Sequence, residues 1–446
     1  MLPSRTRTSL ATSSSHFSNE LPSIQSLVEQ AKGLHHETFL SEDGLVCTVA
    51  PGRVNLIGEH TDYSQGFVFP MAIGFSTVCV GTGSIVEEDK AECKIISVNA
   101  NLPKMITFQS SHEMNPLPTS DPDSWSNYVA GVVNEYMKVL PEKTSICLEI
   151  AVCGDVPLGS GLSSSAALEV AVATFIETII KRKFPDIDIG GKKDKALRCQ
   201  KAENVFCNSP CGIMDQYVSS TASEGSAILI DCRSLEYESV QMRSSDDEED
   251  GEMPVFLICN SDVKHSIGGG EYPVRVKQCA DATKILKSLC GETIESLRDA
   301  TLEDVEMAHK KRKDGGTPLM DDLIYRRAKH VVTENKRTQD AKRALINGDW
   351  QLFGRKMNES HESMKVDYEV SCEEIDFLAE TAQKFEGVYG SRLTGGGFGG
   401  CTVTMVKRSR VKALCEHLKG EYTSRWGKDL PCFETVPGPG ARELIL

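Results

Sequence analysis

A short segment between residues 51 and 63 concentrates side chains that could bind hydroxyls and phosphate. It reads Pro-Gly-Arg-Val-Asn-Leu-Ile-Gly-Glu-His-Thr-Asp-Tyr, and it places Arg53, Glu59, His60 and Asp62 close together. Carboxylates accept hydrogen bonds from hydroxyls, histidine can donate or accept one, and arginine can stabilise phosphoryl charge or fix a carboxylate. A surface loop with incidental ion pairs would have the same composition, and the single histidine lacks the HExxH spacing of a zinc site. Taken alone, the segment leaves both interpretations open.

Residues 154–167 form a second segment, which combines glycines with serines. An apolar run ends at Gly154, a loop with Gly159 and Gly161 follows, and three serines from Ser163 open a helical pattern. Glycines let backbone N–H groups approach phosphate oxygens, and a helix start supplies free N–H groups and the positive end of its dipole. The pattern therefore predicts an anion-binding loop, although a serine-capped helix after a tight turn would share it.

A third segment, from Thr394 to Cys401, consists mainly of glycine. Its Gly395, Gly397 and Gly400 match the GxGxxG pattern of dinucleotide-binding folds, but that pattern must open a helix, and this one leads into the strand-like run Cys-Thr-Val-Thr-Met-Val. We expect a strand, a tight loop and a second strand, either beside a ligand or as a plain hairpin. The sequence contains neither the Walker A pattern nor the HRD and DFG motifs of protein kinases, which excludes those two classes.

The composition predicts a folded scaffold large enough to position these segments. The chain has 446 residues, 40% hydrophobic and 25% charged, which is typical of about two to three domains. A formal charge of −15 argues against binding to nucleic acid or to an anionic membrane surface. No window reaches the roughly 18 apolar residues of a membrane span, and the start of the chain lacks the apolar core of a signal peptide.

The cysteines indicate a reducing compartment. All 16 are scattered without the spacing of a disulfide framework or a paired CxxC zinc site, and no second pair complements Cys207 and Cys211. We therefore expect reduced thiols and a cytoplasmic protein. Residues 1–19 share the Ser, Thr and Arg content of transit peptides, but their arginines are few and no amphipathic face is visible, so that a disordered tail is favoured.

Runs of β-branched residues alternate with helical patterns, which indicates a mixed α/β or α+β protein rather than a bundle or a sandwich. We predict strands over 45–50, 76–85, 145–153, 226–232, 255–261 and 401–406. Helices are predicted from Trp125 to Leu140, where apolar residues repeat at helical spacing, and over 163–181, 320–347 and 350–364. The acidic run at 244–252 is interpreted as a solvated loop between the two halves.

Together and in this order, the three segments resemble those of the galactokinase branch of the GHMP small-molecule kinases. PGRVNLIGEHTDY resembles the galactokinase signature, VPLGSGLSSSAALE the shared phosphate loop and LTGGGFGGCTVT the third family motif. CGIMDQ at 211–216, HSIGGGEYPVRVKQC at 265–279 and DYEVSC at 367–372 fit as well, and the similarity spans about residues 45–406.

The resemblance implies a two-lobed α+β fold. It places a tail and leading helix at 1–44, an N-terminal GHMP kinase domain like ribosomal protein S5 domain 2 at 45–235, and a C-terminal ferredoxin-like GHMP kinase domain at 236–446. The last strand would be able to return to the first lobe.

It also implies transfer of the γ-phosphoryl group of MgATP to the C1 hydroxyl of α-D-galactose, with ATP and Mg²⁺ as cofactors. Asp215 matches the catalytic base, and Arg53 matches the charge-stabilising arginine, which should keep that carboxylate ionised. The positions that hold the sugar correspond to Arg53, Glu59, His60, Asp62, Gly212, Asp215 and Tyr272. Those that hold the nucleotide correspond to Gly159, Ser160, Gly161, Leu162, Ser163, Ser164 and Ser165, with Trp125 near the adenine. Ser165 and Glu203 match the Mg²⁺ ligands.

Two relatives within this family offer alternatives. An N-acetylgalactosamine kinase typically has isoleucine at the position of Thr61, so that Thr61, together with EYPVR, favours galactose. A non-catalytic sensor of galactose and ATP can lack part of the Ser-Ala stretch, which is complete here from Ser163 to Ala167. The chain departs from close relatives at Lys264, where they often have arginine. Lysine cannot make the bidentate contact that arginine can make at this position. The expected partners are the two substrates alone, in a monomer or a weak dimer.

Overall fold

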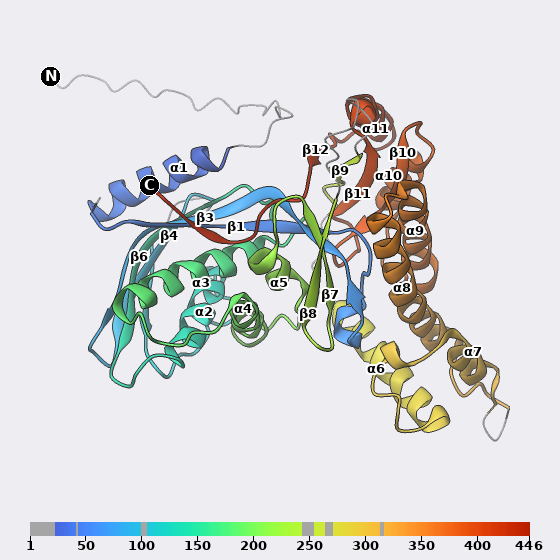
Figure 1. The fold of residues 1–446 in the computed structure, drawn as a ribbon, viewed down its shortest axis with the longest axis horizontal. Helices are drawn as coiled ribbons and strands as arrows, with labels where there is room; N and C mark the ends of the chain where they lie inside the picture. The colour runs from blue at the N-terminus through green and yellow to red at the C-terminus, as the bar shows by residue number, and fades with distance from the viewer. Residues whose placement is uncertain (1–22, 42, 100–104, 243–253, 264–270, 313–315) are drawn as a thin grey trace.

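The computed structural model describes residues 23–41, 43–99, 105–242, 254–263, 271–312 and 316–446. In this part of the chain two lobes lie side by side, each built on its own sheet (Figure 1). The N-terminal tail, the acidic run at 244–252 and Lys264 lie outside the described residues.

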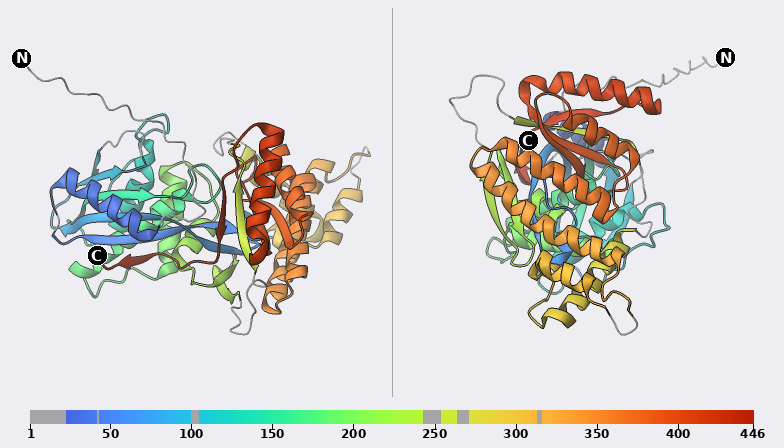
Figure 2. Two further views of the ribbon diagram at one scale, coloured as in Figure 1. Left: turned by 90° about the horizontal axis from the view of Figure 1, so that it is seen from above. Right: turned by 90° about the vertical axis from the view of Figure 1, so that its right-hand side faces the viewer.

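The first lobe is built on a six-stranded sheet with the order β13-β1-β3-β6-β4-β5. Its neighbouring strands are antiparallel except for β4 and β6, which are parallel. The strands are β1 (Val46–Asn55), β3 (Pro70–Val86), β4 (Ala91–Ser97), β5 (Ile106–Ser110), β6 (Ser145–Gly154) and β13 (Arg442–Leu444). Because β13 pairs with β1, the C-terminal strand does return to the first lobe, and Figure 2 shows this segment crossing from one lobe to the other.

Helices cover both faces of this sheet, since both faces carry apolar side chains. The helix α1 (Ile24–Phe39) packs on one face, and α2 (Asn127–Met137), α3 (Ser164–Lys183), α4 (Lys192–Phe206) and α5 (Met214–Thr221) lie on the other side (Figure 1). The small and β-branched side chains of α3 are buried against β1 and β3, which fixes the start of this helix relative to the sheet. Two 3₁₀ turns, η1 (Asp62–Ser64) and η2 (Ser124–Ser126), complete this lobe.

A small sheet lies where the two lobes adjoin. It has the order β2-β7-β8, formed by β2 (Phe67–Val68), β7 (Ser226–Asp231) and β8 (Glu236–Gln241). The predicted division at residue 235 falls between β7 and β8, which pair with each other. That division stays a prediction, and the C-terminal segment contributes β12 to the second lobe and β13 to the first.

The second lobe contains a four-stranded antiparallel sheet with the order β10-β11-β9-β12. Its strands are β9 (Pro254–Asn260), β10 (Val388–Thr394), β11 (Cys401–Lys407) and β12 (Cys432–Thr435). In chain order this arrangement is 2-3-1-4, with a helix between the third and fourth strands, which is the ferredoxin-like order that the resemblance implied.

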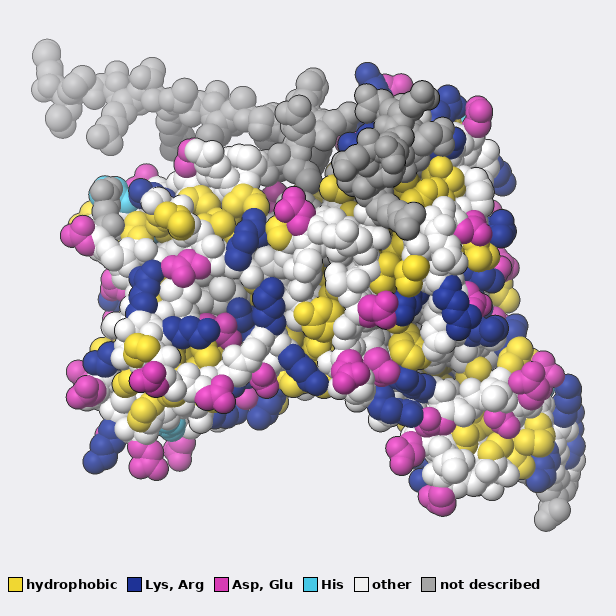
Figure 3. Space-filling view, in the orientation of Figure 1, with side chains coloured by type: hydrophobic (Ala, Val, Ile, Leu, Met, Phe, Trp, Pro, Cys, Tyr) yellow, Lys and Arg dark blue, Asp and Glu magenta, His cyan; other side chains and the backbone are white. Residues whose placement is uncertain are grey.

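The helices of this lobe are α8 (Asp322–Ile346), α9 (Trp350–Ser363), α10 (Glu373–Gln383) and α11 (Val411–Trp426), with a π-helical turn η5 (Met364–Tyr368) and the 3₁₀ turns η4 (Leu297–Asp299) and η6 (Arg408–Arg410). The helices α6 (Glu271–Cys290) and α7 (Leu302–Lys310) form a projection at the lower right of Figures 1 and 3. Acidic and basic side chains are interspersed over the face shown in Figure 3.

The six predicted strands and four predicted helices are all present, with small differences in their bounds. β3 begins six residues before its predicted start and β1 ends five residues after its predicted end. The helix predicted from Trp125 to Leu140 is shorter than predicted. Trp125 instead lies in the 3₁₀ turn η2, and α2 runs only from Asn127 to Met137, because the chain tightens before the helix and turns at Lys138. Within the described residues, no helix combines the length and apolarity needed to cross a membrane.

Candidate active site

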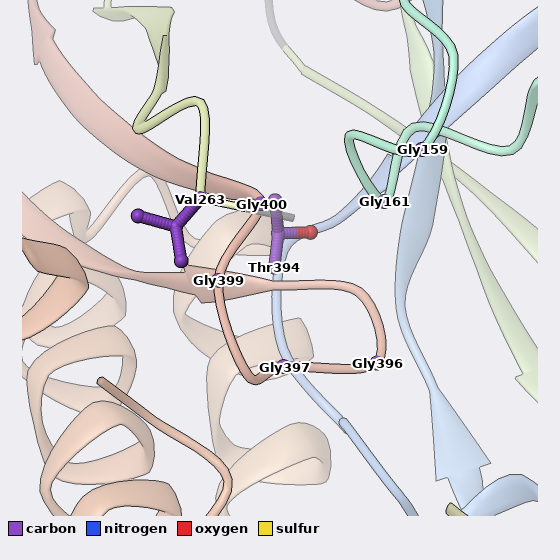
Figure 4. A pocket seen from close by; sticks show the side chains of 8 residues that line it. All are labelled: Gly159, Gly161, Val263, Thr394, Gly396, Gly397, Gly399 and Gly400. Carbon is purple, nitrogen blue, oxygen red and sulfur yellow. The ribbon is translucent and has the colours of Figure 1, made fainter. Parts of the chain in front are cut away.

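The glycine loop before α3 and the loop between β10 and β11 face each other between the lobes (Figure 4). A Cβ atom at Gly395 would lie 2.8 Å from the carbonyl oxygen of Gly161, and one at Gly400 would lie 2.8 Å from that of Ser160. A larger residue at Gly395 or Gly400 would displace the backbone of the loop that contains Ser160 and Gly161. The third segment is therefore a strand, a loop and a strand, as predicted, and it lies directly against the predicted anion-binding loop. The pocket between them is lined by Gly159, Gly161, Val263, Thr394, Gly396, Gly397, Gly399 and Gly400.

Arg53 and Asp215 form a partly buried ion pair beside these loops. Arg53 Nε donates to Asp215 Oδ1 at 2.8 Å and its Nη2 donates to Oδ2 at 2.6 Å, in bidentate geometry. Arg53 Nη1 also donates to the carbonyl oxygen of Gly161, and the hydroxyl of Ser163 donates to Asp215. Arg53 of strand β1 and Asp215 of the first turn of α5, which are 162 residues apart in sequence, thus meet at the glycine loop before α3. Charge-assisted bidentate pairs of this kind fix both partners in one orientation.

Glu59 connects the first segment to the third. Asn55 Nδ2 donates to Glu59 Oε2 at 2.9 Å, and the backbone N–H of Gly395 donates to Glu59 Oε1 at 2.7 Å. Burial raises the pKa of Glu59, while the nearby Arg392 and Arg53 oppose that rise. The carboxylate therefore holds the two segments in register.

His60 lies among aromatic rings with one nitrogen unpaired. Its Nδ1 lies 3.0 Å from the hydroxyl oxygen of Tyr63, and its ring centre is 5.8 Å from that of Tyr272 and 4.9 Å from that of Tyr368. Its Nε2 atom is buried and has no hydrogen-bond partner among the described residues. Burial lowers the pKa of His60 to about 3, so that the ring is neutral near pH 7. A neutral imidazole with a free nitrogen can exchange one hydrogen bond with a ligand hydroxyl.

Asp62 and Gly212 are in close contact. A Cβ atom at position 212 would lie 1.6 Å from Asp62 Oδ2, so that glycine is needed to leave room for this carboxylate. Burial, together with the negative charge of Asp215, raises the pKa of Asp62 to about 7. The site therefore holds two aspartates whose surroundings differ, because only Asp215 has an arginine partner.

Ser165 and Glu203, the predicted metal ligands, lie together beside this pair. Burial raises the pKa of Glu203 to about 7, the charge of Asp215 adds to that rise, and a hydrogen bond with the Ser165 side chain opposes it. Mg²⁺ keeps several waters and needs only one or two carboxylates, so that a serine hydroxyl beside a buried carboxylate fits it. In the described ranges, no group of three or more His, Cys, Asp or Glu side chains is arranged to hold a metal ion. Cys207 and Cys211 are therefore not part of such a group.

The other predicted nucleotide residues differ in their surroundings. Leu162 is fully buried in a core cluster, and its carbonyl oxygen accepts from the backbone N–H of Arg53, while the Ser160 hydroxyl donates to the Pro157 carbonyl. These two side chains shape the loop from within. Ser164 begins α3 and is half-buried, whereas Trp125 packs against the first-lobe core.

Comparison with known proteins agrees with this geometry. Three family profiles match the chain, described as galactokinase galactose-binding signature at residues 33–82, GHMP kinases N terminal domain at 127–223 and GHMP kinases C terminal at 341–423. The chain is 42% identical to the galactokinase of Homo sapiens over 432 residues, which cover 95% of this chain and 98% of the human protein. The chain belongs to the galactokinase family. It is likewise 37% identical over 406 residues to a galactokinase of Haemophilus influenzae (strain PittGG), across 90% of this chain and 95% of that protein.

Solved structures place the fold in the same family. The galactokinase of Lactococcus lactis, crystallised with galactose, superposes with a TM-score of 0.79 at 30% identity, covering 94% of this chain and 100% of that one. A mevalonate kinase superposes with a TM-score of 0.56 at 17% identity, over 87% of this chain and 98% of that chain, which shows a shared fold. Membership of the galactokinase family makes this chain an ATP-dependent sugar kinase with the GHMP fold.

This galactokinase-family site also depends on residues that the sequence analysis did not select. Arg392 is fully buried, donates to the Asn55 carbonyl oxygen at 2.9 Å and lies 3.6 Å from Glu59. Glu334 accepts from the backbone N–H of Gly58 at 2.9 Å. Asn55 stands within a quoted motif, where its neighbours could have drawn attention to it. Arg392 and Glu334 come from β10 and α8, and no local pattern marks them.

Proposed function

We propose that this galactokinase-family chain transfers the γ-phosphoryl group of MgATP to the C1 hydroxyl of α-D-galactose, giving galactose 1-phosphate and ADP. The observation that carries the proposal is the Arg53–Asp215 pair, because it joins the phosphate loop to the segment that carries Glu59, His60 and Asp62. A carboxylate held between a phosphate site and a polyol site is positioned to act on both reactants.

Asp215 is the proposed catalytic base. A sugar hydroxyl is a weak nucleophile, and a carboxylate within hydrogen-bond reach can orient it and accept its proton as the new P–O bond forms. Arg53 keeps Asp215 in place through two hydrogen bonds and lies near enough to the loop to offset charge on the phosphoryl group. The hydroxyl of Ser163 provides a third contact to the same carboxylate.

The proposed sugar site is formed by the first segment, residues 51–63, and by α6. Glu59, Asp62 and the free Nε2 atom of His60 offer hydrogen bonds to sugar hydroxyls. Gly212 leaves the space that Asp62 occupies, and Tyr272 packs beside His60. The Lactococcus lactis relative, which was crystallised with galactose, supports galactose as the sugar.

The nucleotide phosphates are proposed to lie on the glycine loop and at the start of α3. The loop from Gly159 to Leu162 and the serines Ser163, Ser164 and Ser165 supply backbone N–H groups and hydroxyls there, with Trp125 near the adenine. Ser165 and Glu203 would hold Mg²⁺. When bound, the ion neutralises charge on the phosphate oxygens and helps to align them for transfer.

Two further proposals concern the setting of the enzyme. All sixteen cysteines are free thiols, which matches the expected reducing compartment, and we propose a cytoplasmic location. We propose a monomer as the working unit, because both lobes and all the proposed site residues come from one chain.

A substrate panel tests the proposal. Purified protein is incubated with MgATP and galactose, N-acetylgalactosamine, glucose or galacturonate, and ADP release is measured. The highest kcat/KM is expected for galactose, because Thr61 stands where an N-acetylgalactosamine kinase typically has isoleucine. A preference for N-acetylgalactosamine would support that alternative kinase. Binding of galactose and ATP without ADP release from any sugar would instead support a sensor.

A further inference from the structure

Glu169 is a buried acid that the proposed mechanism does not use. It lies on α3 one turn after Ser165, so that the two side chains extend from the same face of the helix. Its side chain is fully buried, which is rare for an acid without a cationic partner. A buried carboxylate at this position must serve a purpose that offsets the cost of removing it from water.

The amide of Gln216 joins Glu169 to Glu203. Gln216 Nε2 donates to Glu203 Oε2 at 2.6 Å and to Glu169 Oε2 at 3.0 Å. The amide nitrogen carries two hydrogens, and each of them is used by one carboxylate. Gln216 is itself fully buried and follows Asp215 directly in α5. The amide that links the two glutamates is therefore in the same helix turn as the proposed base.

Two oxygens of this cluster remain unpaired. Glu169 Oε1 and Gln216 Oε1 are both buried and have no hydrogen-bond partner among the described residues. A buried acceptor without a donor is unfavourable, and most such atoms in proteins are paired. Both oxygens belong to side chains that are linked through the Gln216 amide to Glu203, which is proposed to hold Mg²⁺ with Ser165. A hydrated Mg²⁺ ion keeps several waters, and every one of them carries hydrogens to donate.

We propose that Glu169 and Gln216 form the outer shell of the magnesium site. Gln216 holds Glu203 in the orientation of a metal ligand, Glu169 anchors Gln216, and the two free oxygens accept hydrogen bonds from water bound to the ion. Both are positioning residues, because they act through Glu203 and water. The inference rests on the proposed role of Ser165 and Glu203 as ligands.

Magnesium-dependent nucleotide binding tests this without a reaction. The dissociation constant of ADP is measured by isothermal titration calorimetry with saturating MgCl₂ and with EDTA, and the ratio gives the magnesium enhancement. Glu169→Gln should reduce this enhancement by about tenfold or more, as is typical for outer-shell partners, while the affinity for ADP in EDTA stays within about twofold. Gln216→Met should give the same loss, and it serves if Glu169→Gln fails to fold.

The helix α3 offers a matched control. Glu177 lies two turns beyond Glu169 and is also largely buried, but it pairs with Lys195 and Tyr136 away from the loop. Glu177→Gln should leave the magnesium enhancement unchanged. If Glu203→Gln reduces the magnesium enhancement but Glu169→Gln and Gln216→Met leave it unchanged, the proposed outer-shell role of Glu169 and Gln216 is wrong. If Glu203→Gln also leaves it unchanged, the proposed metal ligand itself is wrong.

Discussion

The two ends of helix α3 bury acids in different ways. Toward its C-terminal end, Glu177 accepts from the Tyr136 hydroxyl at 2.6 Å and lies 2.9 Å from Lys195 Nζ, so that charge and hydrogen bonds are balanced. Toward the glycine loop, Glu169 shares one amide with Glu203 and keeps an oxygen unpaired. A balanced cluster stabilises the fold, whereas an unbalanced one retains capacity to bind a ligand.

The same contrast extends across the loop end of the helix. The buried Nε2 atom of His60 also lacks a hydrogen-bond partner among the described residues. Unpaired buried atoms of His60, Glu169 and Gln216 thus lie near the place where the three motifs meet. Substitutions near the loop should impair binding or chemistry, and substitutions at the far end should impair stability.

The largest effect is expected for Asp215→Ala. Loss of the proposed base should lower kcat by about a thousandfold, within the range of general base catalysis. ADP release with galactose and MgATP measures the rate, and calorimetry should show that ATP still binds. The exposed Asp186 provides a control, because Asp186→Ala should keep the full rate. A wild-type rate in Asp215→Ala would show that another group accepts the proton.

At the far end of α3, Glu177→Gln should lower the free energy of unfolding by about 3 kcal/mol, because it leaves the buried ammonium group of Lys195 without its counter-charge. Urea unfolding followed by circular dichroism measures this change. Burial and the neighbouring charge of Glu203 raise the pKa of Glu169, so that this side chain has no counter-charge to lose and Glu169→Gln should not lower stability. Equal losses in the two variants would mean that both acids are structural and would remove the contrast.

The pH dependence of stability provides a third test. The pKa of Asp62 is about 7 in the folded protein against 3.8 in the unfolded chain, so that folding takes up a proton between these values. The contribution of Asp62 to the free energy of unfolding therefore falls as the pH rises from about 4 to about 7, and it is lowest above pH 7.

Because Asp62 is only partly buried, solvent reduces the effect, and we expect about 2 kcal/mol across this range. Urea unfolding of the ligand-free protein and of Asp62→Asn at several pH values should show the difference between them growing with pH. Parallel curves would contradict the raised pKa.

Much of the fold could be predicted from the sequence, because local patterns decide it. Runs of β-branched residues located the main strands, helical spacing located the helices, and the glycines of the third segment indicated a loop between strands. Trp125 was misplaced because apolar spacing does not distinguish a 3₁₀ turn from the first turn of a helix.

The site itself could be predicted only in part. Family motifs identified Arg53 and Asp215, whose contact spans 162 residues and has no local signal. Three charged residues stand alone within apolar or mixed segments of the sequence, and only tertiary packing shows that they are buried beside the site: Arg392, Glu334 and Glu169. Whether a buried acid has a partner is likewise decided by distant segments, as Lys195 and Gln216 illustrate for the two glutamates of α3.

The smallest effect, and the most local test of the loop end, is expected for Gly212→Ala. A Cβ atom here would lie 1.6 Å from Asp62 Oδ2, 2.4 Å from its Cγ and 3.1 Å from its Cβ, so that the Asp62 carboxylate must rotate away and its Cβ must shift slightly. The protein should fold, but Asp62 should no longer reach the sugar, so that the KM for galactose rises about tenfold, the loss of roughly one hydrogen bond to a charged group. The KM for ATP should stay unchanged. Gly191→Ala is the matched control, since a Cβ there meets nothing within 4 Å. A rise in both KM values would indicate that Asp62 shapes the whole site rather than the sugar pocket, and no rise in either would remove Asp62 from substrate binding.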